Sequence, residues 1–195
     1  GDAEIYYQVI RFFKPKKIVE IGSGQSTLIA LEAIKKNKLE NNYSTELICI
    51  EPYENNWLEN LGIEIMRKKI EDVDLDLCKR LKANDILFID SSHIIRPQGD
   101  ILKEFLEILP SLNPGVIIHI HDIYTPRNYP ERWLKKENRF YNEQYLLEAM
   151  LDNSNRYSVM LGLNFLKNDH FDKLKICCPY LKEDTEPGSF YLRVN

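Results

Sequence analysis

Short apolar runs alternate with segments of helical periodicity along almost the whole chain. A short apolar run bounded by turn residues favours a strand, whereas apolar positions that recur every three or four residues favour a helix. The predicted strands are residues 17–21, 46–51, 64–68, 85–90, 116–120, 157–165 and 189–194. The predicted helices are residues 3–13, 26–38, 56–61, 74–81, 99–109 and 142–152. Residues 38–45 are expected to form a surface loop.

The order of these elements predicts the fold class. Apolar strands that alternate with helices are typical of a parallel sheet with helices on both faces. The last two strands are separated by a polar stretch that contains Pro179, Pro187 and Gly188 and shows no helical pattern. Strands without a crossover helix pair antiparallel. We therefore expect one α/β domain over residues 1–195, a three-layer sandwich with a seven-stranded, mostly parallel sheet and a reversed last strand.

Composition narrows the class of protein. The chain of 195 residues has 44% hydrophobic and 29% charged residues, which is typical of a soluble globular domain. Its formal net charge of -4 gives no electrostatic reason to expect nucleic acid or an anionic membrane as a partner. We see no apolar run of membrane-spanning length and no signal peptide, so we expect a cytoplasmic protein. The first residue is Gly1 rather than a methionine, which is compatible with trimming from a longer chain.

The four cysteines do not suggest a disulfide framework or a zinc site. Cys49 falls in a predicted strand, Cys177 and Cys178 are adjacent, and no C-x-x-C pair is formed with Cys78 or any other cysteine. A reducing compartment fits this pattern, with most of the cysteines acting as small buried hydrophobes.

A glycine turn links the first predicted strand to the next helix in the stretch "KKIVEIGSGQSTLIALEAI", residues 16–34. Glycines at such a turn let backbone N–H groups face a ligand. In an open α/β sheet the ligand crevice lies beyond the carboxyl ends of the strands. The residues at these ends are mostly polar: Glu20, Gly22, Ser23, Gly24, Glu51, Ile70, Glu71, Asp72, Asp90, Ser91, Ser92, His93, His121 and Asp122.

These residues favour a cationic nucleoside over a dinucleotide. Glu51 closes the second strand, where a carboxylate can accept hydrogen bonds from both ribose hydroxyls, and Pro52 with Tyr53 can form a wall beside an adenine. A solvated carboxylate at a strand end is the alternative for Glu51. Thr27 stands where a dinucleotide site has its third glycine, and Glu20 would repel a pyrophosphate. S-adenosylmethionine carries an ammonium and a sulfonium where NAD carries phosphates, so it fits better.

Four motifs in order give the chain a resemblance to the class I S-adenosylmethionine-dependent methyltransferases over nearly its whole length. They are "VEIGSGQST", "ICIEPY", "DILFIDSSH" and "LNPGVIIHIHD". The resemblance implies a Rossmann-like sheet with a reversed seventh strand. It also implies that Glu20, Gly22, Ser23 and Gly24 surround the methionine part of the cofactor. Glu51 would then hold the ribose, and the Ile70–Glu71 region would border the adenine together with Pro52. Asp90 is also expected among the cofactor-binding residues.

Three of the four histidines fall in or after the fourth and fifth predicted strands: His93, His119 and His121. Asp90 and Asp122 close the same two strands. Carboxylates beside an imidazole can hold a divalent cation, which lowers the pKa of a bound hydroxyl.

The motif "IDSSH" followed by "HD" resembles the metal-dependent sugar O-methyltransferases and the cephalosporin hydroxylase-like relatives within this family. That resemblance implies Asp90, His121 and Asp122 as ligands of a divalent cation such as Mg²⁺, and His93 as the base, with Asp90 the second choice. The subset usually has an acidic residue where His121 stands. A neutral ligand there weakens affinity for a hard cation and can change the preferred metal.

Several of these residues also have purely structural interpretations. Asp90 can cap a turn, Asp122 can accept from backbone amides, and His119 is expected to be a core histidine. In the segment after Asp122, aromatic residues alternate with Arg127 and Arg132, which is compatible with a lid over a polar acceptor or with a loop packed on the domain. The aromatic residues in question are Tyr124, Tyr129 and Trp133.

The sequence therefore predicts methyl transfer to an oxygen of a small polar acceptor, with a sugar-like or glycosylated compound favoured. Neither nucleic acid nor a membrane is expected as a partner. Two other classes stay open. One is a non-catalytic cofactor-fold module of a larger glycan-modifying protein, and the other is an NAD-dependent oxidoreductase, which Thr27 and Glu20 disfavour.

Overall fold

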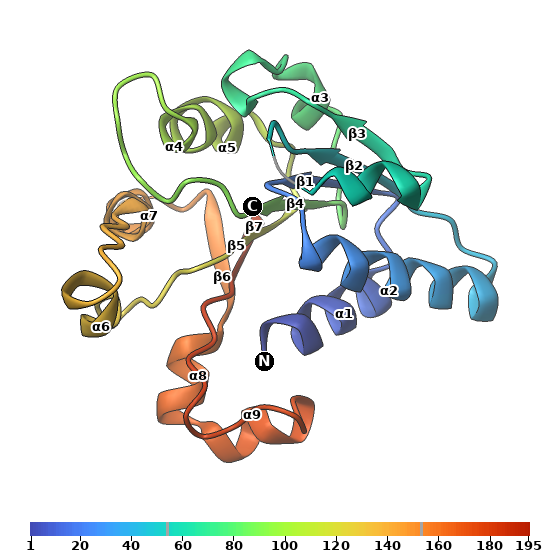
Figure 1. The fold of residues 1–195 in the computed structure, drawn as a ribbon. Helices are drawn as coiled ribbons and strands as arrows, with labels where there is room; N and C mark the ends of the chain where they lie inside the picture. The colour runs from blue at the N-terminus through green and yellow to red at the C-terminus, as the bar shows by residue number, and fades with distance from the viewer. Residues whose placement is uncertain (54, 153) are drawn as a thin grey trace.

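The protein is described here by a computed structural model that covers residues 1–53, 55–152 and 154–195. A seven-stranded sheet runs through its centre in the order β3-β2-β1-β4-β5-β7-β6 (Figure 1). Strands β1 to β5 pair parallel wherever they are neighbours, and β7 is antiparallel to both β5 and β6. The strands are β1 (Lys17–Ile21), β2 (Glu46–Ile50), β3 (Glu64–Met66), β4 (Ile86–Ile89), β5 (Ile117–Ile120), β6 (Tyr157–Gly162) and β7 (Phe190–Val194).

Helices cover both faces of the sheet (Figure 1). One face carries α1 (Asp2–Phe13), α2 (Gln25–Asn41), α8 (Leu163–Asp169) and α9 (Phe171–Cys177). The other carries α3 (Asp76–Lys79), α7 (Glu143–Asp152) and a continuous helix of α4 (Asp100–Lys103), the π-helical η3 (Glu104–Ile108) and α5 (Leu109–Ser111). Between these elements lie η1 (Asn56–Leu61), η2 (Ile70–Asp72) and α6 (Glu131–Lys135). None of the helices in the described part of the chain combines the length and the apolar character needed to cross a membrane.

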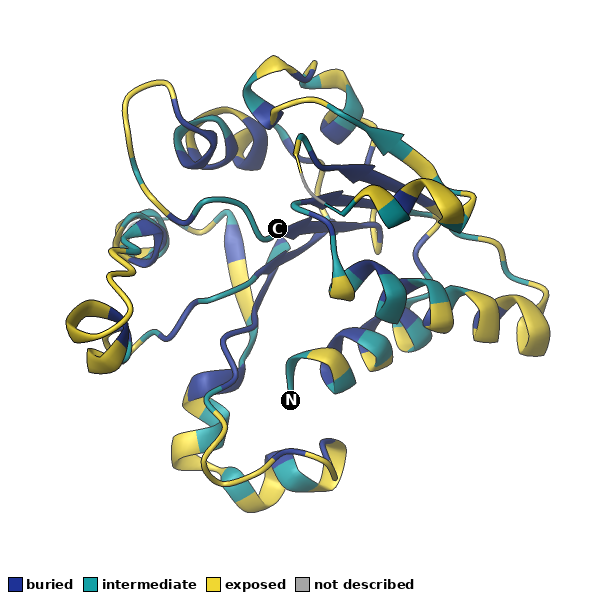
Figure 2. Ribbon diagram, viewed as in Figure 1, coloured by how far each residue is buried: buried dark blue, intermediate teal, exposed yellow. Residues whose placement is uncertain are grey.

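The central strands are apolar on both faces because both faces are covered (Figure 2). Side chains alternate along a strand, so Ile18 and Phe88 pack under α1 and α2, whereas Val19 and Leu87 pack under α3 to α7. Two hydrophobic cores result, one on each side of the sheet. This double burial explains why the strands are continuous apolar runs in the sequence.

The predicted fold class and the reversed last strand are confirmed. Two expectations near the end of the chain are wrong. The predicted strand 157–165 stops at Gly162, where the ring of Phe190 lies against the glycine Cα, and residues 163–165 begin α8. The polar stretch before β7 contains α8 and α9, because Leu163, Leu166 and Leu174 face the core beside α1 while charged and amide side chains occupy much of the remaining surface of both helices. In the first half, α2 also extends to Asn41, into the expected loop 38–45.

Backbone hydrogen bonds between neighbouring strands continue one residue beyond the strand ends, so the first residues after these strands lie side by side. The Gly22 N–H donates to the Ile50 carbonyl at 3.0 Å, and the Asp90 N–H donates to the Ile21 carbonyl at 2.9 Å. The His121 N–H donates to the Ile89 carbonyl, also at 2.9 Å. The residues after β1, β4 and β5 are therefore fixed in one row at the carboxyl edge of the sheet.

At the opposite edge, Asp85 joins the starts of β1 and β4, and we expect Asp85→Ala to destabilise the protein. Its carboxylate is 5% exposed and accepts the N–H groups of Lys16 (3.0 Å), Lys17 (2.9 Å) and Lys82 (2.8 Å). Loss of this acceptor leaves partly buried donors unpaired and is expected to cost about 1–3 kcal/mol in free energy of unfolding, measured by urea denaturation. The exposed Asp184→Ala serves as control. Equal stability of the two variants would contradict this account.

Candidate functional site

The glycine turn after β1 lies directly on the end of β4. Gly22 has a φ of 76°, and a Cβ built on it would stand 1.8 Å from the carbonyl oxygen of Asp90. Only glycine fits this backbone conformation and this approach. The turn that begins α2 and the residue that ends β4 are therefore held in direct contact.

Glu20 lies beneath the turn and is completely buried. The Thr27 hydroxyl donates to its Oε2 at 2.6 Å, and the Gly24 N–H donates to the same hydroxyl oxygen at 3.1 Å. Thr27, which stands in place of a third glycine, thus joins Glu20 to the turn. The Oε1 atom of Glu20 has no hydrogen-bond partner among the described residues. Burial raises the pKa of Glu20 to about 7.

Glu51 joins the end of β2 to the glycine turn. Its carboxylate accepts the N–H of Ser23 at 3.2 Å and the N–H of Tyr53 at 3.0 Å. The Asn55 amide donates to the Ser23 carbonyl at 2.9 Å. Glu51 therefore holds the glycine turn and the residues after β2 together at the carboxyl edge of the sheet.

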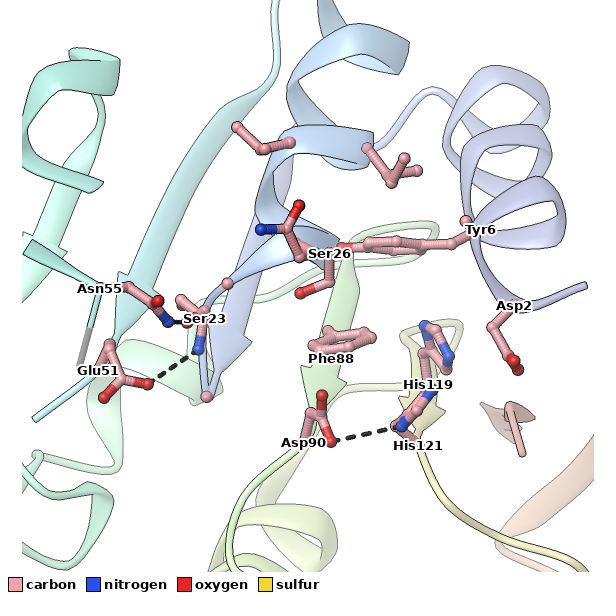
Figure 3. Close-up of a pocket in the computed structure, with 16 residues that line it drawn as sticks. Asp2, Tyr6, Ser23, Ser26, Glu51, Asn55, Phe88, Asp90, His119 and His121 are labelled. Atoms are coloured by element: carbon pink, nitrogen blue, oxygen red, sulfur yellow. Dashed lines mark hydrogen bonds and ion pairs between the residues drawn. The ribbon is translucent and has the colours of Figure 1, made fainter. Parts of the chain in front are cut away.

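Two cavities meet at this edge of the sheet and share Gly22, Glu51 and Asp90. The first, of about 600 Å³, lies between the glycine turn, α1 and the ends of β4 and β5 (Figure 3). Among the predicted cofactor-binding residues, Ser23 and Gly24 also line this first cavity. The second, of about 460 Å³, is lined by others of that set, namely Pro52, Ile70 and Glu71. Their assignment to a cofactor stays a prediction, and Glu20 lies behind the lining rather than in it.

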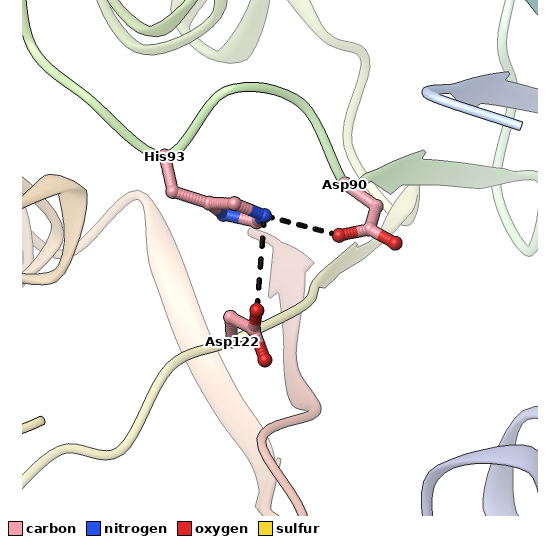
Figure 4. A group of neighbouring side chains, drawn as sticks. All are labelled: Asp90, His93 and Asp122. Atoms are coloured by element: carbon pink, nitrogen blue, oxygen red, sulfur yellow. Dashed lines mark ion pairs between the residues drawn. The ribbon is translucent and has the colours of Figure 1, made fainter. Parts of the chain in front are cut away.

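A cluster of two aspartates and two histidines lies beside the first cavity (Figures 3 and 4). His93 Nε2 is 3.2 Å from Asp90 Oδ1 and 3.8 Å from Asp122 Oδ2. His121 Nδ1 is 3.4 Å from one oxygen of each aspartate. Ligand atoms of Asp90, His93 and Asp122 all lie within 4.8 Å of one another, a spacing that can hold a metal ion. The structure thus brings all four predicted residues together, and His93 lies as close to the aspartates as His121 does.

Mutual interactions set the charges of this cluster. Burial alone would raise the pKa of Asp90, but the His121 and His93 rings outweigh burial and hold that pKa well below its usual range. Burial opposes a charged His121 ring, yet Asp90 and Asp122 raise its pKa to about 9. Burial likewise opposes a charged His93, and the carboxylates of Glu143 and Asp90 overcome it and raise the pKa of His93. Asp90 is therefore held ionised, whereas burial raises the pKa of Asp122 despite the neighbouring His121 and His93 rings.

Three residues lie at the site although no motif or pattern near them in the sequence marks them as site residues. Glu143, the first residue of α7, bonds to His93 Nδ1. Asp2, at the start of α1, accepts from the N–H groups of Gly188 and Ser189 with its Oδ1 and lines the first cavity. Tyr6 lines the same cavity and stacks on Phe88 with ring centroids 5.1 Å apart. All three reach the site only through long-range folding, which motif spacing does not encode.

His119 is buried beside the cavity, in keeping with its expected core position. Its Nε2 lies 2.8 Å from the Ser189 hydroxyl, its ring stacks on Tyr191 at 4.1 Å, and its Nδ1 has no partner among the described residues.

The aromatic residues after Asp122 form a small core of their own. Tyr124, Tyr129 and Trp133 are buried against one another and against Tyr141. None of these side chains belongs to the described linings of the two cavities. The packed-loop interpretation therefore fits this segment better than a lid over the acceptor.

Comparison with solved structures defines the class of this fold. The O-methyltransferase TomG from Streptomyces achromogenes, solved with SAM, has a TM-score of 0.60 at 15% identity, with 99% of this chain and 79% of TomG covered. An O-methyltransferase from Bacillus cereus, solved with SAH, has a TM-score of 0.55 at 14% identity, with 99% and 80% covered. The MycE methyltransferase of the mycinamycin pathway, solved with Mg, SAH and mycinamycin VI, has a TM-score of 0.55 at 13% identity, with 98% and 48% covered. The chain has the fold of these methyltransferases.

The family follows from the sequence itself. The model of a family described as "Methyltransferase domain" matches residues 19–123, from β1 to the residue after Asp122. The chain belongs to this methyltransferase family, which confirms the resemblance seen in its motifs. A protein of Archaeoglobus fulgidus, described only as uncharacterized, is 38% identical over 91 residues. That match covers 44% of this chain and 39% of the archaeal protein, so the chain corresponds to well under half of that relative's length.

Glu20→Gln is expected to stabilise the ligand-free protein at pH 8 and to change little at pH 5. The pKa of about 7 lies above the ordinary value of 4.5, so burial of ionised Glu20 costs stability that grows as the pH rises from about 4.5 through about 7. Glutamine keeps an acceptor for Thr27 without a charge. The gain in free energy of unfolding at pH 8 is expected to approach about 3 kcal/mol, by urea denaturation. The same difference at both pH values would contradict the shifted pKa.

Proposed function

We propose that the chain is an S-adenosylmethionine-dependent O-methyltransferase that acts on a small polar acceptor, with a sugar-like or glycosylated compound favoured. The observation that carries this proposal is the meeting of two cavities at Gly22, Glu51 and Asp90, directly beside a cluster of aspartates and histidines. Membership of a methyltransferase family and the O-methyltransferases among the similar folds support the reaction class. MycE, solved with mycinamycin VI, supports a small-molecule acceptor. The free thiols of all four cysteines agree with a cytoplasmic location.

The residues at the glycine turn fit the proposed cofactor. Glu51 lines both cavities at their junction, where its carboxylate would accept hydrogen bonds from the ribose hydroxyls. Pro52, Ile70 and Glu71 would then surround the adenine in the second cavity. Glu20, with an unpartnered buried oxygen beneath the turn, supplies a carboxylate close to the cationic methionine end. When bound, S-adenosylmethionine supplies a methyl group on a sulfonium for in-line displacement.

The donor set at the strand ends fits a divalent cation. Asp90 and Asp122 offer carboxylate oxygens, and His121 offers an imidazole nitrogen close to both, which leaves His93 for the role of base. When bound, a cation orients an acceptor hydroxyl and lowers its pKa. Mixed carboxylate and imidazole donors suit Mn²⁺ or Fe²⁺ as well as Mg²⁺.

In the proposed mechanism His93 removes the proton of the acceptor hydroxyl at Nε2. This nitrogen faces Asp90 and Asp122, whereas Nδ1 is occupied by Glu143. Of the two carboxylates that raise the pKa of His93, a cation would engage Asp90, whereas Glu143 stays bonded to Nδ1. Asp90 is the second candidate for the base, because it is ionised and borders both cavities. Catalysis then depends mainly on position and on deprotonation of the nucleophile.

Calorimetric titration of S-adenosylhomocysteine into the protein tests the cofactor. We expect micromolar binding that falls by roughly tenfold or more in Glu51→Ala, because hydrogen bonds to a ribose are each worth about 1–2 kcal/mol. The control is Glu46→Ala, an exposed carboxylate on the same strand. Absence of heat with folded wild-type protein, with and without Mg²⁺, would contradict the cofactor. Binding without transfer to a panel of hydroxylated and glycosylated acceptors would favour the non-catalytic module.

Binding of Mn²⁺, followed by electron paramagnetic resonance, tests the metal ligands without an acceptor. Asp122→Asn is expected to weaken binding by roughly tenfold or more, because it removes one of two carboxylates from the donor set. The exposed Asp184→Asn is the control.

The unusual ligand His121 gives a second test of the same site. His121→Glu is expected to raise affinity for Mg²⁺, since a carboxylate is a better ligand than imidazole for a hard cation. Unchanged Mg²⁺ affinity in His121→Glu, or an Mn²⁺ affinity in Asp122→Asn equal to that of the wild type, would exclude the cluster as the metal site.

A further inference from the structure

The backbone of His93 adopts an unusual conformation that a distant segment holds in place. Its φ is 59°, in the left-handed region that residues other than glycine seldom occupy. The Asn142 N–H donates to the His93 carbonyl at 3.0 Å, and the Asn142 side-chain oxygen accepts the Ile95 N–H at 2.6 Å. Asn142 therefore holds the loop after β4 at His93 itself and two residues further along, at Ile95.

The next residue along the chain holds the imidazole ring itself. Glu143 is completely buried, and its Oε1 bonds to His93 Nδ1. The Tyr141 ring lies against the imidazole with centroids 4.5 Å apart and an interplanar angle of 32°. The three residues before and at the start of α7 thus fix the backbone, one face and one nitrogen of His93.

We propose that Glu143 is the positioning residue for His93, which it orients so that Nε2 faces Asp90, Asp122 and the acceptor. This inference deepens the proposed function and rests on it for the role of His93. A carboxylate accepts hydrogen bonds and has none to donate when ionised, so it requires the proton of the imidazole to be on Nδ1. Nε2 is then the nitrogen that exchanges a proton on the cavity side, 3.2 Å from Asp90 Oδ1.

A second buried glutamate, Glu104, lies near the same loop and provides a comparison for the positioning role of Glu143. It is also completely buried, on the π-helical turn η3, and its Oε2 accepts the Ser91 hydroxyl at 3.1 Å. It supports the same loop after β4, but its hydrogen bond goes to Ser91, whereas the bond to His93 Nδ1 comes from Glu143. Glu104→Gln therefore removes an equally buried carboxylate beside the loop and leaves the His93 hydrogen bond intact.

Proton and nitrogen NMR of histidine-labelled protein tests the proposal directly. In the wild type we expect a far-downfield Nδ1 proton, assigned to His93 by its loss in His93→Gln. Glu143→Gln is expected to move this signal upfield or to lose it to solvent exchange, whereas Glu104→Gln is expected to retain it. Glu143→Asp, with a shorter carboxylate, is expected to shift it as well and provides the measurement if the glutamine variant does not fold.

Affinity for S-adenosylhomocysteine separates this inference from the proposed function. Glu143 lines neither cofactor cavity, so its variants are expected to bind S-adenosylhomocysteine within about twofold of the wild type. An Nδ1 signal unchanged in Glu143→Gln and Glu143→Asp would overturn the positioning role. Failure of the wild type to bind the nucleoside would instead overturn the proposed function, with the NMR result standing on its own.

Discussion

The contact between the Gly22 backbone and the Asp90 carbonyl is the constraint on which the site depends. A Cβ at Gly22 would stand 1.8 Å from that oxygen, so the turn that begins α2 lies on the end of β4 with no side chain between them. Parallel pairing of β1, β4 and β5 then brings the glycine turn and the Asp–His cluster to one edge. Gly22, Glu51 and Asp90 border both cavities as a direct result.

Charge is distributed unevenly over this edge. Beneath the turn, Glu20 is shielded from water and its pKa is raised by burial, so it favours either a proton or a cationic ligand. At the ends of β4 and β5, the histidines beside Asp90 hold the pKa of that carboxyl low. A methyl donor with a positive charge and a divalent cation are both compatible with such a site, and a pyrophosphate is not.

Motifs at the strand ends were predictable from sequence because parallel strands bring their carboxyl ends together. Glu51, Asp90 and Asp122 were found in this way. The pattern does not predict the helices α8 and α9, since their short apolar stripes are interrupted by polar residues. It extends the preceding strand into residues 163–165 and leaves the remainder without a helix. The site residues contributed from a distance were missed too: Asp2 and Glu143 lie far along the chain from the motifs they join. Thr27 was noticed only as a departure from a dinucleotide pattern, and its bond to Glu20 explains that departure.

A crystal structure with S-adenosylhomocysteine and Mn²⁺ is the most direct test of the account. We expect the ribose hydroxyls at Glu51, the adenine in the cavity lined by Pro52 and Ile70, and an anomalous Mn²⁺ peak on Asp90 and Asp122. A nucleoside bound away from Glu51, or a metal peak outside the Asp–His cluster, would contradict the central claim that cofactor and acceptor chemistry meet at Asp90.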